Sequence, residues 1–91
     1  MIPEEVKEEF KKAIEADKTK VWAGVNQTMR KIHSGKAKIV LIAEDADPPA
    51  LVTPVAQEAK IKKIAHYFGT KSEIAKVAGC PRLAAAAILL K

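Results

Sequence analysis

The stretch Lys38-Ile39-Val40-Leu41-Ile42-Ala43 decides the fold of this chain. Its apolar run is short and continuous, which is typical of a central β-strand covered by helices on both faces. The segment 44–49, Glu-Asp-Ala-Asp-Pro-Pro, follows directly and predicts a polar loop at the carboxyl end of that strand. Open α/β sheets tend to bind ligands beyond the carboxyl ends of their strands. The sequence therefore indicates a functional region around this loop.

The segments before this strand predict two helices and a short strand. A helix over residues 3–17 begins with Pro3 followed by two glutamates, which suit the positive end of the helix dipole. Residues 20–22 are a short strand candidate. A second helix is expected over residues 24–34, with Gly35 as its C-terminal cap.

The segments after the central strand continue the alternation. Apolar spacing predicts a helix over 50–60, and residues 64–68 suit a second strand. Residues 70–73, Thr-Lys-Ser-Glu, form a capping box that starts a short helix ending at Gly79. Residues 84–90 begin with alanines that favour helix and end with Ile-Leu-Leu, which suits a strand. The preceding alternation favours a final strand.

Together these elements predict the α/β class and one architecture. With 91 residues, 48% hydrophobic and 30% charged, the chain has the composition of one globular domain. We expect a single domain over residues 1–91, folded as a three-layer α/β/α sandwich around a central mixed sheet of about four strands.

The charge of the chain favours an acidic partner. The net charge is +5, and it is unevenly spread. Residues 1–20 contain five lysines and six acids, whereas residues 21–91 contain eleven basic residues and five acids. The basic character therefore belongs to the body of the domain, which is consistent with nucleic-acid binding.

Two features bear on the compartment. A single cysteine, Cys80, excludes an intramolecular disulfide and is compatible with a reducing cytoplasm. Residues 1–20 are charged throughout, and no run of about 18 apolar residues occurs, so neither a signal peptide nor a membrane span is expected. We therefore predict a cytoplasmic protein without a membrane partner.

No enzyme constellation is visible. The acids of the loop 44–47 could in principle serve acid–base or magnesium chemistry, but beside two prolines they favour a turn and a helix cap. His33 and His66 lack ligand partners at metal-binding spacing. We expect no catalytic residue, no metal, no cofactor and no enzyme activity.

The predicted helix 24–34 has two distinct faces. Val25, Met29 and Ile32 recur at helical spacing and should face the core. The other face carries two amides and two cations, which are Asn26, Gln27, Arg30 and Lys31. Amides and cations together suit a ligand that offers base edges and phosphates, although a simply solvated face is the alternative. Gly24 permits close backbone approach, and the free amides of the first turn can bind an anion.

Three stretches carry a resemblance to a known family. They are 24–27 (Gly-Val-Asn-Gln), 35–48 (Gly-Lys-Ala-Lys-Ile-Val-Leu-Ile-Ala-Glu-Asp-Ala-Asp-Pro) and 78–82 (Ala-Gly-Cys-Pro-Arg). In this order and spacing they resemble the superfamily of kink-turn RNA-binding ribosomal proteins. That superfamily includes the archaeal seven-Ae and thirty-e proteins and the spliceosomal fifteen-point-five-kilodalton protein. The resemblance covers nearly the whole chain and implies the same α/β/α sandwich.

The resemblance also implies an RNA-binding site. It implies that Asn26, Gln27 and Arg30 read the sheared G·A pairs of a kink-turn. It places Asp47 and Leu51 near an extruded nucleotide, with the loop 80–83 against the same region. The residues expected to bind RNA are Gly24, Val25, Asn26, Gln27, Arg30, Lys31, Lys36, Glu44, Asp47, Leu51, Cys80, Pro81, Arg82 and Leu83.

The chain departs from the family pattern at three places. Gln27 stands where a glutamate is usual, so a charged acceptor for guanine becomes a neutral amide. Arg30 replaces a lysine, which keeps the charge but alters its reach. Trp22 and Ala23 replace a basic pair, which removes two expected phosphate contacts.

These observations predict a non-enzymatic RNA-binding protein that recognises kink-turn RNA. It would work in the ribosome or in a guide-RNA or processing ribonucleoprotein, with partner proteins there, and would be a monomer when free. The alternative is a protein-interaction and dimerisation module on the same fold, as the growth-arrest stress-protein branch of the superfamily implies. The change at Gln27 and the missing basic pair keep this alternative open.

Overall fold

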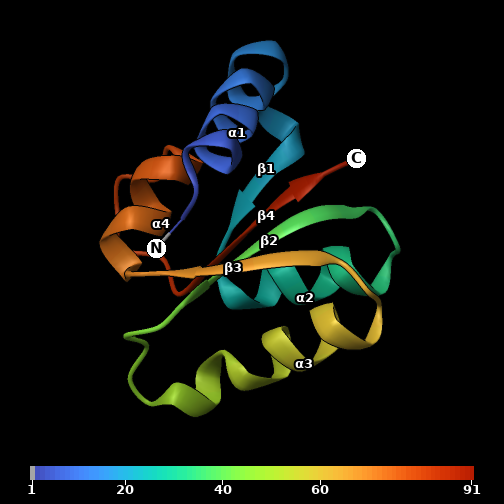
Figure 1. Ribbon diagram of the computed structural model, residues 1–91, viewed down its shortest axis with the longest axis vertical. Coiled ribbons are helices and arrows are strands. Elements are labelled where there is room, and N and C mark those ends of the chain that lie inside the picture. Colours follow the sequence, from blue (N-terminus) through green and yellow to red (C-terminus); the bar gives the residue numbers. More distant parts are fainter. Residues whose placement is uncertain (1) are drawn as a thin grey trace.

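The computed structural model describes residues 2–91, which form alternating helices and strands around one sheet (Figure 1). In chain order the elements are α1 (Glu4–Ala16), η1 (Lys18–Lys20), β1 (Val21–Ala23), α2 (Val25–His33), β2 (Ala37–Ala43), η2 (Pro49–Leu51), α3 (Thr53–Ile61), β3 (Ala65–Gly69), α4 (Lys71–Ala78) and β4 (Ala86–Leu90). The labels η1 and η2 denote short 3-10 helices. No helix within residues 2–91 has the length and apolar character needed to cross a membrane.

The sheet has four strands in the order β1-β4-β2-β3. Strands β2 and β3 are parallel, whereas β4 is antiparallel to both β1 and β2. Helices α1 and α4 pack together on one face of the sheet, and α2 and α3 pack together on the other (Figure 1). The structure therefore confirms the predicted α/β/α sandwich with a mixed sheet.

The central strand is β2. All its residues except Lys38 are buried, and Val40, Leu41 and Ile42 have no exposed surface. The continuous apolar run of the sequence is thus explained by helices on both faces. The exposed Lys38 ammonium instead reaches the carboxylate of Glu9 on α1, at 3.3 Å.

The last segment of the chain contains alanines that favour helix and branched residues that favour strand, and it forms a strand. β4 lies between β1 and β2, so its position in the sheet requires a strand regardless of local propensity. Ala86, Ala87 and Ile88 are fully buried, and both α2 and α4 contact this strand. Small side chains there leave room for the two covering helices.

The start of α3 is later than predicted. The sequence indicated a helix over 50–60, but the structure has the 3-10 helix η2 first and α3 from Thr53. A helix starting at residue 50 would need an amide hydrogen on Pro54 to bond the carbonyl of Ala50, and proline has none. Pro54 therefore lies in the first turn of α3, where no such bond is required.

The buried stripe of α2 is centred on Thr28 and Ile32, both of which are fully buried. Val25 and Met29 are partly buried beside them and pack against the core, as predicted. Residues four apart lie on the same helix face, so a stripe through Thr28 and Ile32 turns Asn26 and Arg30 outward. The core thus determines which polar side chains α2 presents to solvent.

Candidate nucleic-acid interface

The sheet register brings three separate segments to one end of the molecule. The Gly24 N–H donates to the Ala86 carbonyl, and the Ala43 N–H donates to the Ala85 carbonyl, each at 2.8 Å. The start of α2, the segment after β2 and the segment before β4 therefore meet (Figure 1). We call this end the loop pole and define it as residues 24–30, 44–51 and 79–85.

The start of α2 depends on a glycine. Gly24 is the N-cap with φ +107° and ψ 145°, a conformation that L side chains rarely adopt. A Cβ at this position would meet no atom within 4 Å, so the backbone angle rather than crowding requires glycine. No side chain of the described residues caps α2. Its first-turn N–H groups and partial positive charge thus suit an anion.

The polar face of α2 is divided into two parts. Asn26 and Arg30 are exposed and lie one turn apart, so their side chains form one ridge. Lys31 is half-buried, and its Nζ lies 4.8 Å from the centre of the Trp22 ring. Trp22 is itself held by a 2.6 Å hydrogen bond from its Nε1 to the Thr19 carbonyl. The Lys31 charge is therefore directed toward β1 rather than along the exposed ridge.

Gln27 lies at the boundary between these two parts. It is half-buried, one residue from the exposed Asn26 and one turn before Lys31. Its amide offers both a donor and an acceptor at the first turn of the helix. Gln27 is therefore placed beside the free first-turn N–H groups.

The loop after β2 is attached to the start of α4. One carboxylate oxygen of Asp45, Oδ1, accepts a hydrogen bond from the Lys71 N–H at 2.8 Å. Ala46 is buried, whereas Glu44 and Asp47 are exposed and the Asp47–Pro48 peptide bond is cis. Asp45 thus accepts a hydrogen bond from the first turn of α4, whereas no side chain of the described residues caps η2 or α3. Asp45 is a positioning residue, because its hydrogen bond attaches the loop to α4.

The capping box at α4 is present as predicted. The Glu73 N–H donates to Thr70 Oγ1 at 3.1 Å, and the Thr70 N–H donates to Glu73 Oε1 at 3.2 Å. The second of these bonds favours the charged carboxylate and holds the pKa of Glu73 below its ordinary value of 4.5. The start of α4 is therefore a fixed support for Asp45 and its loop.

The loop before β4 begins with a left-handed glycine. Gly79 has φ +69°, and the Cys80 N–H donates to the Ala75 carbonyl at 2.8 Å, which closes α4. Beyond the half-buried Cys80, the side chains of Pro81, Arg82 and Leu83 are exposed. Leu83 is 66% exposed, and Leu51 across the loop pole is 49% exposed. Both leucine side chains are therefore open to solvent at this end of the molecule.

The structure does not bring Lys36 to the loop pole. Lys36 precedes β2, whereas Glu44 follows it, and the seven residues of β2 span roughly 20 Å at the usual strand rise. Lys36 therefore lies apart from the other residues that are expected to bind RNA. Helix α2 starts at the loop pole and ends at the opposite end of the sheet, which carries Lys36 away.

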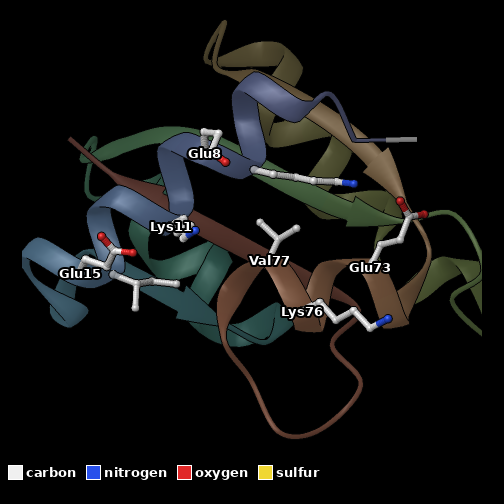
Figure 2. A pocket seen from close by; sticks show the side chains of 8 residues that line it. Glu8, Lys11, Glu15, Glu73, Lys76 and Val77 are labelled. Carbon is white, nitrogen blue, oxygen red and sulfur yellow. The ribbon is translucent and has the colours of Figure 1, made fainter.

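A groove between α1 and α4 is separate from the predicted site (Figure 2). It has a volume of about 550 Å³ and is lined by Lys7, Glu8, Lys11, Ile14, Glu15, Glu73, Lys76 and Val77. None of these residues was predicted to bind RNA, and their charges balance. Within residues 2–91, no group of three histidine, cysteine or acidic side chains is arranged to hold a metal ion.

Comparison with known proteins agrees with this fold. Residues 4–91 match the model of the ribosomal protein L7Ae/L30e/S12e/Gadd45 family, and the chain belongs to that family. Its members are mostly non-enzymatic RNA-binding proteins. The resemblance noted from the sequence is thereby confirmed.

Among solved structures, the chain is similar to the 15.5kD RNA binding protein of Giardia lamblia. The two share 24% sequence identity and superpose with a TM-score of 0.76. The match covers 94% of this chain and 68% of the Giardia protein. At this identity the likeness establishes the fold.

Proposed function

We propose that the protein binds kink-turn RNA through the loop pole, as a non-enzymatic component of the ribosome or of a small ribonucleoprotein. The observation that carries this proposal is the convergence of the uncapped start of α2 with two exposed loops at one end of the sheet. Membership of a mostly RNA-binding family supports it.

The start of α2 supplies the contacts that distinguish one RNA from another. The side-chain amides of Asn26 and Gln27 each offer a donor and an acceptor, which match the exposed edges of sheared G·A pairs. The first-turn N–H groups and Arg30 contact the sugar–phosphate chain beside them. A helix of this kind enters only a widened groove, so the bend of the RNA itself contributes to recognition.

The two loops hold the unpaired part of the RNA. Leu51 and Leu83 are exposed apolar side chains on opposite loops, and covering them with a splayed base removes apolar surface from water. Arg82 is exposed next to Leu83 and can bind a phosphate with its planar guanidinium group. The loops thus recognise a base that has left the helical stack.

The loop pole has no net positive charge. Arg30 and Arg82 are accompanied by Glu44, Asp45 and Asp47, all five exposed. Attraction to any polyanion is therefore weak at this end, and recognition depends on shape and hydrogen bonds. This is the expected charge distribution for a selective site.

The test is a titration of two RNAs that differ only in their G·A pairs. We expect the kink-turn RNA to bind at least ten-fold more tightly than the RNA whose G·A pairs are replaced by Watson–Crick pairs. Equal binding of both RNAs would contradict the proposal. Equal weak binding together with a dimer in solution would favour the protein-interaction module instead.

A further inference from the structure

The end of the molecule opposite the loop pole carries a second basic surface. Helices α2 and α3 both end there, and the parallel strands β2 and β3 both begin there (Figure 1). The turn 34–36 and the segment 60–64 therefore lead into neighbouring strands of the sheet. We call this end the lysine pole and define it as residues 34–36 and 60–64.

The backbone of the lysine pole is held in place. The Lys36 carbonyl accepts a hydrogen bond from the Lys91 N–H at 2.9 Å, and the Ile64 N–H donates to the Ala59 carbonyl at 2.8 Å. Nearby, His33 Nε2 lies 3.6 Å from a carboxylate oxygen of Glu58, which joins the ends of α2 and α3. The lysines thus project from a fixed surface rather than from a free tail.

The lysine pole carries positive charge that no ion pair of the fold neutralises. Four lysines are exposed there: Lys36, Lys60, Lys62 and Lys63. Among residues 2–91, none of them belongs to a side-chain ion pair, because the pairs in that part of the chain are Lys7–Glu4, His33–Glu58 and Lys38–Glu9.

Part of this charge has a structural role. Lysines near a helix C-terminus offset the negative end of its dipole, which amounts to about half a charge per helix. The two helix ends together balance about one of the four lysines. About three positive charges remain for a partner.

We propose that the lysine pole binds the phosphate backbone of a second RNA segment, so that the protein bridges two parts of an RNA. Exposed lysines on a fixed surface suit phosphates, because each ammonium acts as a point charge that displaces counterions. The pole offers no amide or aromatic side chain to read bases, so this contact is independent of sequence.

An acidic protein is the less suitable partner for this surface. Protein interfaces are centred on well-packed apolar or aromatic residues, with charges at the rim. The one exposed apolar side chain among residues 34–36 and 60–64 is Ile61. A surface of four exposed lysines with a single exposed isoleucine has the composition of a phosphate-binding rim without such a centre.

The two poles are too far apart for one short contact. Strand β2 runs from one pole to the other and spans roughly 20 Å at the usual strand rise. An RNA that bends at the loop pole can reach the lysine pole only through a second helix or a long stem. This inference adds a site to the proposed function but does not depend on it, because the lysine pole would bind RNA without a kink-turn.

The experiment compares two triple variants with the same change in charge. The lysine-pole variant carries Lys60→Gln, Lys62→Gln and Lys63→Gln. The control carries Lys11→Gln, Lys12→Gln and Lys18→Gln, which are exposed lysines on and after α1 without ion pairs among the described residues. Both triple variants alter exposed surface, so thermal unfolding should show them folded like the unmodified protein.

The first probe is a fully paired RNA duplex of about 20 base pairs, titrated between about 50 and 200 mM KCl. We expect the unmodified protein and the control to bind it alike. We expect the lysine-pole variant to bind at least about ten-fold more weakly at the lowest salt, with a salt slope smaller by about two to three units. Equal affinities and slopes for the two variants would overturn the proposal.

The second probe is a minimal kink-turn RNA with stems too short to span both poles. Both variants should bind it equally, which separates the two sites. If this RNA bound no more tightly than the same RNA without its G·A pairs, the function proposed for the loop pole would be refuted. The result with the duplex would still stand as a test of the lysine pole. A third probe, polyglutamate, tests an acidic protein as the partner. If the lysine-pole variant lost polyglutamate binding but kept its binding to the duplex, the RNA assignment would be overturned.

Discussion

The loop pole and the lysine pole lie at opposite ends of the same parallel strands, β2 and β3. They differ in backbone conformation and in the kinds of side chain that they expose. At the loop pole the backbone is irregular, with a glycine N-cap at Gly24 and a left-handed Gly79. Its exposed side chains mix amides, apolar groups and both signs of charge. At the lysine pole two helices simply end, and the exposed side chains are mostly lysines.

The two poles therefore suit different parts of RNA binding, which are selectivity between RNAs and general affinity for RNA. Hydrogen bonds and apolar contacts distinguish one RNA from another, whereas phosphate contacts increase affinity for all of them. The loop pole has the groups for the first role, and the lysine pole has the groups for the second. Substitutions at the two ends should therefore change different properties of binding.

The largest effect is expected from Asn26→Ala. This change removes an exposed amide at the first turn of α2, and loss of a base-edge contact costs about 1–3 kcal/mol of discrimination. Affinity for kink-turn RNA should fall by about ten-fold to a hundred-fold, measured by fluorescence anisotropy. Gln57→Ala, an exposed amide on α3, is the matched control and should have no effect. Equal losses in the two variants would remove Asn26 from the site.

A gain is expected from Gln27→Glu. The substitution restores a carboxylate beside the first-turn N–H groups, and hydrogen bonds to a charged group are about twice as strong as neutral ones. Binding to kink-turn RNA should tighten by about ten-fold, while binding to a paired duplex should not improve. A weaker kink-turn complex would mean that Gln27 faces phosphate rather than guanine.

A smaller loss is expected from Arg30→Ala. Arg30 is exposed on the same ridge as Asn26, where its guanidinium can contact phosphate. Binding at low salt should weaken several-fold, and the slope of log affinity against log salt should fall by about one unit. Arg30→Lys should preserve the slope. An unchanged slope in Arg30→Ala would exclude a phosphate contact.

The smallest effect is expected from Glu73→Gln, and it concerns stability. The hydrogen bond from the Thr70 N–H lowers the pKa of Glu73, so in the unmodified protein the charged carboxylate stabilises the fold above pH 4.5. That stabilisation is lost as the pH falls below 4.5 through the lowered pKa. The variant should show less acid sensitivity in thermal unfolding over this window. Identical pH profiles would mean that the capping box does not contribute.

Much of the fold could be predicted because local and global preferences agree. The continuous apolar run of β2, the capping box at Thr70 and the glycine after α2 each have one structural interpretation, and the structure confirms all three. The start of α3 was less predictable, since proline is tolerated at several positions of a first turn. Pro54 therefore does not determine which residue begins the helix. The order of the strands depends on contacts between distant segments, which no local pattern contains.

The candidate site was predictable in its parts but not in its arrangement. Asn26 and Arg30 could be placed on one helix face from spacing alone, and the structure places them there. Lys36 stands in the stretch 35–48 that carries the family resemblance, yet the strand β2 separates it from the loop pole. Asp45 was not included because its partner, the Lys71 N–H, is 26 residues away. Position in the sheet, rather than sequence distance, decides which residues meet.

One measurement tests the division between the two poles most directly. It is the ratio of the dissociation constants for kink-turn RNA and for the RNA without G·A pairs, determined for the unmodified protein, the lysine-pole variant and Asn26→Ala. We expect this ratio to be retained in the lysine-pole variant, although both RNAs with long stems bind it less tightly. We expect the ratio to fall toward one in Asn26→Ala. A ratio that falls toward one in the lysine-pole variant and is retained in Asn26→Ala would contradict the division of roles between the two poles.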